Sequence, residues 1–467
     1  MERIGHLTSR WKHHRHAAPA SASVQALWVG AGVLVGTLGT FASNVLIPHI
    51  LPIDDAANYF VASSSVMILA ITLRLGLDRS IVRVVSEAHA RRDPEAAARS
   101  VRAAIIIFAV VSTVAFTALV LGLWRLLAGT LFGSPRLADM AVLIAVWTVL
   151  EAVRLVLSES LRGSEHVLCA TVLGNAGRAA VLTTLLLLLL RANAPNLHAA
   201  ILLSTAASAL LFVLSLGAVF RVFRVRRSSK AHLRLSIDSL VRSSLPFYVT
   251  SLWGFVGTQG DVLLAGILLT KHDVAYYAAA SKLSQVLSLP MVALVLFLSP
   301  SIPRLLASGD LIKLESRIRT ASTLIALPVV AVTLFILVAN KLVIQTVYPA
   351  QYEAAGPILA ILALGPLSTA ISGPNGATLL MTHHAGSVAR STAIVTTAQL
   401  VGMVVGALGF GAYGLAIASS AGSIILNSYY SVLVRRRVGI ATEPYLSRSR
   451  LVSCGQQLRA ALRSGNS

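Results

Sequence analysis

Charged residues are scarce in this chain of 467 residues, and acidic residues are scarcer than basic ones. Only 12% of the residues are charged, whereas a typical soluble domain carries about 25%. Hydrophobic residues make up 56% of the chain, and the mean hydropathy is +0.77. So little charge cannot cover a water-facing surface. The composition therefore argues against a soluble enzyme, a disordered regulator or a nucleic-acid-binding module, and favours a polytopic membrane protein.

Cysteine and the motifs of enzyme catalysis are also nearly absent. The two cysteines, Cys169 and Cys454, lie far apart, which predicts neither a disulfide framework nor a metal site. The sequence has no Walker A loop, nucleophile elbow or HExxH helix. We therefore expect no cofactor and no enzymatic activity. With no nucleotide site, any energy that the protein uses would come from an ion gradient, the membrane potential or consumption of a product rather than from ATP.

Long apolar runs are abundant. A helix needs ~20 mostly apolar residues to cross the hydrocarbon core of a bilayer. The run 354–373 is the weakest, because Pro357 and Pro366 interrupt it and the freed backbone groups need partners. The sequence predicts an all-α fold with twelve spans at 26–48, 57–76, 103–124, 138–160, 167–190, 198–220, 245–269, 274–298, 320–340, 354–373, 388–410 and 412–434.

The basic residues are distributed unevenly between the two sides of the predicted membrane. Of the 39 Lys and Arg residues, 30 fall in the two tails and in the connections on the same side, and 5 fall on the opposite side. Because cytoplasmic loops are enriched in Lys and Arg, this asymmetry places both termini in the cytoplasm. It also accounts for the net charge of +21 without a nucleic-acid partner.

The two halves of the chain contain an internal repeat. An offset of 218 residues aligns 36–63 with 254–281, including a Gly-x-x-Gly-Thr piece and an Asp-x-Ala-x-Tyr piece in each copy. Both copies enter the membrane from the same side, so the repeat is parallel. The sequence thus predicts two six-helix lobes related by a pseudo-two-fold axis along the membrane normal, with spans 1, 2, 7 and 8 bordering a central cleft.

This repeat divides the chain into five parts. We expect an N-lobe at 25–220 and a C-lobe at 243–436, joined by a basic cytoplasmic linker at 221–242. Basic cytoplasmic tails at 1–24 and 437–467 complete the chain. The C-terminal tail mixes leucines with arginines, so it is suited to lie on the anionic inner surface of the membrane.

Six charged residues of the predicted spans are candidates for a functional site, because a charge within a span is costly. Four cations against two acids predict a cleft that suits an anionic ligand such as a lipid diphosphate. The proposed substrate contacts are Arg74, Arg154, Arg178 and Lys282, and the proposed charge partners or ion-coupling residues are Glu151 and Asp261.

The residues of the N-lobe among these six also have structural interpretations. Arg74 lies about one turn from the cytoplasmic end and could extend its guanidinium to the headgroups. Glu151 and Arg154 stand three residues apart on one helical face and could neutralise each other. Arg178 could line the cleft or pair with Glu151.

Similar alternatives apply to the C-lobe and to the polar residues. Asp261 and Lys282 occupy consecutive spans and could form an ion pair. Asn44 and Gln259 are candidates for the cleft, although such side chains more often form interhelical hydrogen bonds.

Several segments together resemble the polysaccharide biosynthesis proteins, including O-antigen flippases, of the multidrug/oligosaccharidyl-lipid/polysaccharide (MOP) exporter superfamily. The resemblance extends over about residues 25–436, and the order and spacing of the segments carry it. It implies two six-helix bundles around a central cleft, alternating access, and transfer of undecaprenyl-diphosphate-linked sugar units from the inner to the outer leaflet. The segments are RLGLDRSIVR at 74–83, SLRG at 160–163, QGD at 259–261, VAYYAAASK at 274–282, PSIP at 300–303 and PNGATLL at 374–380.

The preferred hypothesis is therefore a lipid-linked oligosaccharide flippase of the bacterial inner membrane. Its expected partners are the lipid-linked substrate, anionic lipids of the inner leaflet, a polysaccharide polymerase and glycosyltransferases. The main alternative is a cation-coupled small-molecule or drug antiporter on the same scaffold. A membrane scaffold or a membrane-embedded glycosyltransferase is a third hypothesis, but loops such as 51–56 and 270–273 are too short for a catalytic domain.

Overall fold

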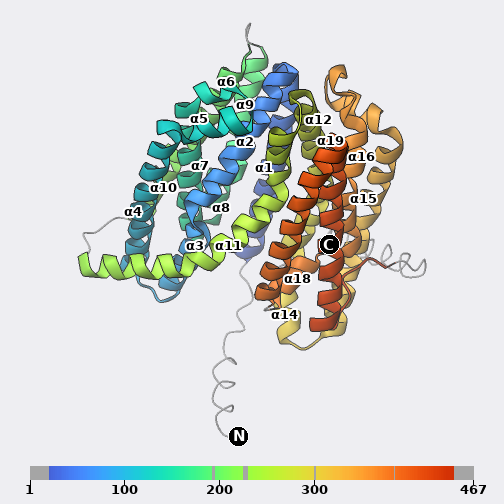
Figure 1. Cartoon of the computed structure of the whole chain (residues 1–467). Coiled ribbons are helices and arrows are strands. Elements are labelled where there is room, and N and C mark those ends of the chain that lie inside the picture. Colours follow the sequence, from blue (N-terminus) through green and yellow to red (C-terminus); the bar gives the residue numbers. More distant parts are fainter. Residues whose placement is uncertain (1–19, 192–194, 224–229, 299–300, 383, 446–467) are drawn as a thin grey trace.

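The computed structural model describes residues 20–191, 195–223, 230–298, 301–382 and 384–445, and these residues form helices joined by short turns without any strand. Figure 1 shows two bundles side by side, the N-terminal half in blue to green and the C-terminal half in yellow to red. Residues 1–19 and 446–467 of the predicted tails and residues 224–229 of the predicted linker 221–242 lie outside the described residues. The lobe boundaries stay a prediction.

The N-terminal half contains helices for all six predicted spans, and π-helical turns (η1–η3) interrupt two of them. Its elements are α1 (Ala20–Ile50), α2 (Ile53–Arg74), α3 (Leu77–Ala90), α4 (Pro94–Ala118), η1 (Leu119–Leu123), α5 (Trp124–Leu126), η2 (Leu127–Leu131), α6 (Pro135–Asp139), α7 (Ala141–Gly163), α8 (Val167–Thr171), η3 (Val172–Ala176), α9 (Gly177–Leu190) and α10 (Leu197–Val222).

The C-terminal half repeats this arrangement with more interruptions. Its elements are α11 (Lys230–Leu268), α12 (Lys271–Ser284), η4 (Gln285–Ser288), α13 (Leu289–Leu298), α14 (Ser301–Ala307), α15 (Leu311–Val347), η5 (Ala350–Tyr352), α16 (Ala355–Leu362), α17 (Leu364–Ser372), α18 (Asn375–Met381) and α19 (Ala385–Arg437).

Within the described residues, eleven helical stretches are long and apolar enough to cross a membrane. The last stretch, α19, has 53 residues and non-helical backbone angles at Phe410 and Gly411. Gly406 and Gly414 pack against each other on either side of this break, and the Gln399 amide donates to the Ser419 carbonyl at 3.1 Å. α19 is therefore a helical hairpin, and it accounts for the last two of the twelve predicted spans.

The span at 354–373 is broken, as its prolines predict. α16 ends at Leu362 and α17 begins at Leu364. Each of the two prolines sits in the first turn of its helix, where no intrahelical partner for its nitrogen is lost. The Ser420 hydroxyl of α19 donates to the Ile361 carbonyl at 2.8 Å. A neighbouring span thus satisfies a backbone group next to the break.

The internal repeat recurs in the helix boundaries and in the packing. The end of α1 and the start of α2 lie 218 residues before the end of α11 and the start of α12. α1 packs on α9, and α11 packs correspondingly on α19; α7 packs on α10, and α17 packs on α19. In the first copy, Gly36 and Gly39 bring α1 against the backbone of the span that contains α9.

The two halves close against each other at the end of the molecule that carries α6, which we call the α6 end. α2 packs on both α11 and α12 there. Gly266 of α11 lies against Val61 of α2, so closely that an added Cβ would collide with the valine. At the exposed margin, Asp54 and His272 approach to 3.8 Å.

At the opposite end, which we call the α3 end, α11 crosses to the N-terminal half. Its first part lies across the lower end of α4 in Figure 1. The buried hydroxyls of Ser80 and Ser244 are 2.6 Å apart. Gly76, with φ of +76°, forms the turn between α2 and α3 and lies directly against the backbone of α11.

Residues 438–445, which we call the C-terminal strap, fold back over the α3 end of the C-terminal half. The Thr442 hydroxyl donates to the last carbonyl of α17 at 2.9 Å. Arg319 of α15 donates to the Glu443 carbonyl at 3.1 Å and stacks over the Tyr445 ring at 4.2 Å. The Tyr445 amide donates to the Thr323 hydroxyl at 2.8 Å. The C-terminal strap therefore joins α15, α17 and α19.

Candidate functional site

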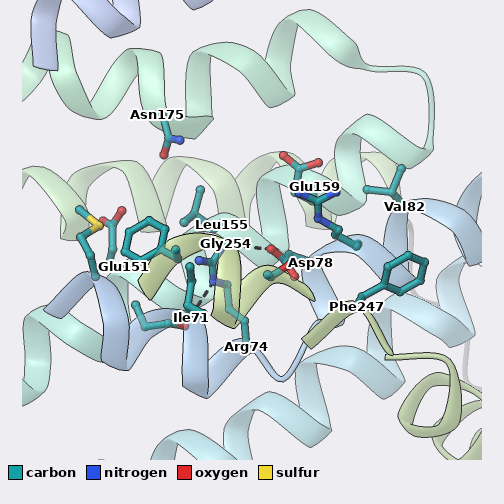
Figure 2. A pocket seen from close by; sticks show the side chains of 15 residues that line it. Ile71, Arg74, Asp78, Val82, Glu151, Leu155, Glu159, Asn175, Phe247 and Gly254 are labelled. Carbon is teal, nitrogen blue, oxygen red and sulfur yellow. Dashed lines mark hydrogen bonds and ion pairs between the residues drawn. The ribbon is translucent and has the colours of Figure 1, made fainter. Parts of the chain in front are cut away.

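A cavity of about 750 Å³ lies between the two halves toward the α3 end. α2, α3 and α7 form one wall, and α11 forms the other with Phe247, Ser251, Gly254 and Phe255. Figure 2 shows Gly254 and Phe247 of α11 among the side chains of the N-terminal half. Because the wall includes the exposed Arg79, the cavity opens at the α3 end.

The mouth of this cavity carries charges of both signs. Arg74 forms an ion pair with Asp78 at 3.0 Å, and the two side chains are 12% and 16% exposed. The Arg74 Nε also donates to the Ala70 carbonyl at 3.2 Å. Glu159, paired with Arg162 at 2.9 Å, lies on the facing helix α7. Arg74 is therefore partly neutralised by the acid one turn away.

A second chamber of about 220 Å³ continues deeper between the halves. It shares Met67, Asn175 and Phe255 with the first cavity, so the two form one cleft. Arg178 and Lys282 are the charged residues in the chamber wall, which contains no acid among the described residues. The remaining wall is mostly hydroxyl, amide and apolar side chains, including Asn44, Tyr59, Gln259 and Gln285.

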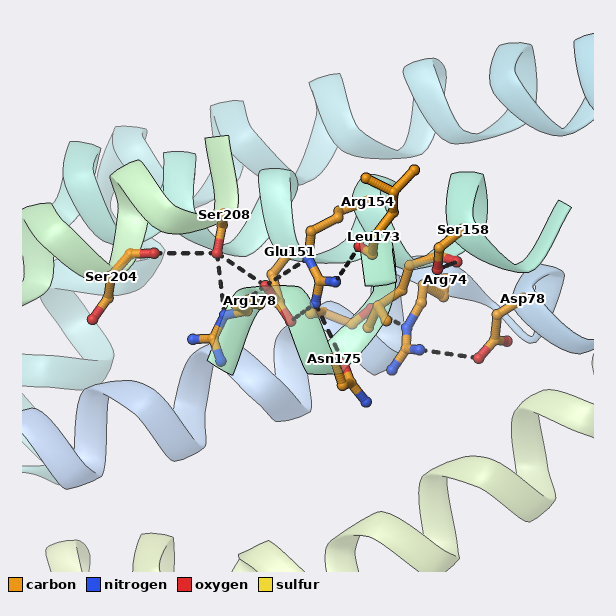
Figure 3. Close-up of polar contacts among 12 residues, drawn as sticks. Arg74, Asp78, Glu151, Arg154, Ser158, Leu173, Asn175, Arg178, Ser204 and Ser208 are labelled. Atoms are coloured by element: carbon orange, nitrogen blue, oxygen red, sulfur yellow. Dashed lines mark hydrogen bonds and ion pairs between the residues drawn. The ribbon is translucent and has the colours of Figure 1, made fainter. Parts of the chain in front are cut away.

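Glu151 of α7 is the centre of a buried polar cluster next to this chamber. Arg154 Nη2 lies 2.6 Å from its Oε1, and Arg178 Nε lies 3.1 Å from its Oε2. The Ser208 hydroxyl donates to Oε2 at 3.0 Å. The convergence on Glu151 is visible in Figure 3, where Arg74 and Asp78 form a separate pair. One carboxylate thus holds two guanidinium groups, and the cluster keeps a net charge of +1.

Local sequence features build this cluster. The spacing of three residues puts Glu151 and Arg154 on one face of α7. The span opposite contains a π-helical turn, η3, in which Gly174 has ψ of −143°. Arg154 Nη1 donates at 3.1 Å to the Leu173 carbonyl, the residue before this kink. Such interruptions are frequent at functional sites, and here the interruption supplies a hydrogen-bond acceptor to a buried arginine.

Arg178 is held by one edge only. Its Nε contacts Glu151 and, at 3.3 Å, the Ser208 hydroxyl. The guanidinium lies 5.9 Å from the centre of the Trp147 ring. Its two terminal nitrogens have no hydrogen-bond partner among the described residues, and the side chain lines the chamber. A planar guanidinium with two unused nitrogens is suited to bind phosphate oxygens bidentately.

Lys282 and Asp261 lie close together but do not form an ion pair within 4.0 Å in the described residues. Lys282 Nζ instead donates to Gln259 Oε1 at 2.7 Å. Asp261 is buried and accepts from the Ser281 hydroxyl at 3.0 Å, the Tyr277 hydroxyl at 3.3 Å and the Val262 amide at 2.8 Å. The alternative of an ion pair between Asp261 and Lys282 is therefore not the arrangement seen here, where hydroxyl and amide donors satisfy the carboxylate.

The structure separates the candidate residues into two groups. Arg74, Arg178, Lys282, Glu151, Asn44 and Gln259 line the cleft. Arg154 is fully buried and Asp261 is 6% exposed, and neither lines the cleft. The expectation that Arg154 contacts substrate does not fit this geometry, since its guanidinium is occupied by Glu151 and Leu173.

Sequence reasoning missed several residues of the mouth. Glu159 lies at the predicted boundary of span 4 and Asp78 just beyond span 2, so neither entered the count of charges within spans. Asn175, shared by both chambers, gave no signal in the sequence. A helical-face count that included the last turn of span 4 would have found Glu159, because it lies eight residues after Glu151 on the same face. No group of three or more potential metal ligands occurs among the described residues.

Comparisons with known proteins agree with this architecture. A family model described as "Polysaccharide biosynthesis protein" matches residues 25–306. No curated protein matches the chain. Among solved structures, an inward-facing multidrug resistance MATE family transporter of the MOP superfamily superposes with a TM-score of 0.71 at 15% identity, over 86% of this chain and 94% of the other.

Two further solved structures share the fold at similarly low identity. The lipid II flippase MurJ, in an inward closed conformation, gives a TM-score of 0.70 at 13% identity, over 88% of this chain and 87% of the other. A MOP superfamily transporter from Pyrococcus furiosus, reported with a binding pocket of reverse polarity, gives a TM-score of 0.60 at 15% identity, over 89% of this chain and 94% of the other. The fold is therefore the one that these MOP superfamily transporters share. The matched family model covers more than half of the chain, and the chain belongs to the polysaccharide biosynthesis protein family.

Proposed function

We propose that this transporter moves undecaprenyl-diphosphate-linked oligosaccharide units across the bacterial inner membrane by alternating access. The observation that carries the proposal is the deep chamber, in which Arg178 and Lys282 stand without an acid in the wall. Guanidinium and ammonium groups in the wall of the chamber favour a diphosphate. The membership of the family supports a lipid-linked sugar as the substrate.

The geometry suggests an order of events. The cleft is open at the α3 end and closed at the α6 end, where Gly266 and Val61 meet. The sugar and diphosphate enter the mouth past Arg74, while the lipid tail stays in the bilayer. The diphosphate then reaches Arg178 and Lys282. Closure of the α3 end and separation of α2 from α11 and α12 would release the substrate on the other side.

The orientation belongs to the same proposal, with the α3 end in the cytoplasm. Single cysteines at Ser228, in the 6–7 connection, and at His272, in the exposed 7–8 turn, test it after Cys169 and Cys454 are replaced by serine. In intact cells, a membrane-impermeant maleimide should label position 272 and should label position 228 only after permeabilisation. Labelling of position 228 in intact cells would show that the protein has the opposite orientation in the membrane.

A cation-coupled drug antiporter is the second candidate, and the acids at the mouth are the observation that favours it. Asp78, Glu151 and Glu159 all line the outer cavity. Each of them, however, has an arginine partner within 3.1 Å. A carrier of organic cations needs acids that a ligand can reach, so this pairing argues for the first candidate.

Transport in proteoliposomes distinguishes the two candidates. Purified protein should carry a fluorescent undecaprenyl-diphosphate disaccharide between leaflets, measured as the fraction that an impermeant quencher reaches over time. Under an imposed proton or sodium gradient, the proteoliposomes should not accumulate ethidium. Ethidium uptake that depends on the gradient, with no movement of the lipid-linked sugar, would favour the antiporter. Genetic support would come from accompanying glycosyltransferase and polymerase genes.

A further inference from the structure

A pocket of about 420 Å³ lies at the α3 end of the C-terminal half, outside the cleft. Leu305 of α14 contributes to it, and its other lining residues come from the first turns of α15. These residues are Lys313, Ser316, Arg317, Thr320, Ala321 and Leu324. Among the described residues, the lining contains two cations, two hydroxyls and no acid.

Polarity changes in one direction along this pocket. Lys313, Arg317, Thr320 and Leu324 recur at intervals of three or four residues, so they form one stripe along α15. The stripe runs from two cations, through a hydroxyl, to an aliphatic side chain, over about 16 Å at 1.5 Å per residue. Further along α15, Leu327 is 56% exposed and continues toward the apolar part of the span.

This change from charged to aliphatic side chains matches the change from headgroup to acyl chain along a membrane lipid. A lipid at this position places its headgroup beside the cations and its acyl chain along Leu324. Ile312 is 85% exposed on the turn beside Lys313, which is expected where the helix meets lipid rather than water. The two ends of the pocket therefore select an amphiphile with an anionic head.

The corresponding turn of the N-terminal half differs in charge. At the start of α4, Arg99 lies 3.8 Å from Asp93 and 3.7 Å from Glu95. At the start of α15, the helix-capping Asp310 pairs with Lys313 at 2.8 Å, but the pocket also contains Arg317. The pocket wall therefore contains two cations, whereas Arg99 of the N-terminal half lies between two acids.

Neither the C-terminal strap nor the segment 446–467 suits this pocket. The C-terminal strap uses Arg319 and Thr323, on the adjacent face of α15. Residues 446–467 carry four arginines and no acid, so like charges disfavour their entry beside Lys313 and Arg317.

We propose that this pocket binds one anionic glycerophospholipid, with the phosphate held by Lys313, Arg317 and the two hydroxyls, and with an acyl chain beside Leu324. Such a lipid fills the space between α14 and α15. The site is independent of the transported substrate, because none of its residues lines the cleft.

Native mass spectrometry of the delipidated full chain tests the proposal. Dioleoyl-phosphatidylglycerol should be retained as a single adduct in preference to dioleoyl-phosphatidylcholine. The double variant Lys313→Ala, Arg317→Ala should bind the phosphatidylglycerol about 30-fold more weakly, since each basic side chain near a membrane surface contributes about a factor of five. Lys313→Arg with Arg317→Lys should retain most of the binding.

Two controls separate the pocket from general electrostatics and from misfolding. Arg191→Ala, at an exposed position of the α6 end, should leave the adduct unchanged. Leu324→Trp keeps both cations but fills the apolar part, and it should also weaken binding. Equal retention of the two lipids by the natural chain, or unchanged phosphatidylglycerol binding in both pocket variants, would overturn the proposal. Displacement of the lipid by millimolar inorganic phosphate would reassign the pocket to a free anion.

Discussion

Replacing Arg178 and Lys282 together by alanine should lower transport of the lipid-linked sugar at least 100-fold. Hydrogen bonds to charged groups contribute about 1.5–3 kcal/mol each, which corresponds to roughly tenfold or more for each cation. Each single variant should therefore lose about tenfold, and Arg178→Lys should keep part of the activity because the charge remains. The measurement is the leaflet-exchange assay in proteoliposomes, with equal amounts of inserted protein.

The fold should survive these changes, which makes the result interpretable. In Arg178→Ala, Glu151 keeps Arg154 as its partner at 2.6 Å. In Lys282→Ala, Gln259 loses its donor but remains in the chamber wall. Arg191→Ala removes an exposed cation remote from the cleft and should transport normally. Undiminished transport by the double variant would refute the cationic chamber as the substrate site while leaving the fold unaffected.

Replacing Glu151 by alanine should instead damage the folded protein. The change leaves Arg154, which is fully buried, and Arg178 without their shared carboxylate. Removing one partner of a buried ion pair costs roughly 3–5 kcal/mol, because the remaining charge stays in a poorly solvating environment. We expect a clear fall in the thermal midpoint in detergent and reduced insertion in cells.

A matched variant on the same helix controls for the loss of an acid. Glu159 pairs with Arg162, but the two side chains are 26% and 36% exposed. Glu159→Ala should therefore cost less than about 1 kcal/mol, as exposed ion pairs do. The variant Glu151→Gln keeps the shape of the side chain and an acceptor oxygen, so its thermal midpoint should lie between those of the two alanine variants. Equal midpoints for the alanine variants at 151 and 159 would show that the Glu151 cluster does not support the fold.

The number and position of the spans could be predicted because the bilayer imposes a length and a composition on each one. The broken tenth span also followed from its prolines. The helical hairpin in α19 was predictable as two spans, since the Phe410–Gly411 break lies where the two apolar runs meet. The repeat was visible because both copies contain the Gly-x-x-Gly-Thr and Asp-x-Ala-x-Tyr pieces. In the first copy, Gly36 and Gly39 pack closely on the span that contains α9.

The charge pairing could be predicted only where it is local in sequence. Glu151 and Arg154 share a helical face, so their contact follows from spacing. The pairing of Arg178 with that same carboxylate depends on how α7 and α9 pack. The carboxylate of Asp261 accepts hydrogen bonds from Ser281 and Tyr277 rather than pairing with Lys282. Which partner it meets depends on how α11 and α12 are placed along each other, to within less than one helical turn.

The division of the cleft into a mixed mouth and a cationic chamber was also beyond the sequence. A count of the charges within spans gives the sign of the net charge in the cleft, but it does not say how deep in the cleft each charge lies. Asp78 lies just beyond its predicted span and Glu159 at the very end of another, and in the folded chain both lie at the mouth. Depth along the cleft depends on helix tilt and on kinks such as the one at Gly174, which hydropathy does not encode.

The C-terminal strap has a consequence for the order in which the protein is made. Arg319 meets its partner Glu443 only 124 residues later in the chain. During synthesis, α15 and α17 enter the membrane long before these residues leave the ribosome. The N-terminal half can therefore complete its contacts while the C-terminal half still lacks the segment that joins three of its helices. The contacts that the C-terminal strap makes with α15 and α17 are therefore among the last that the described chain can form.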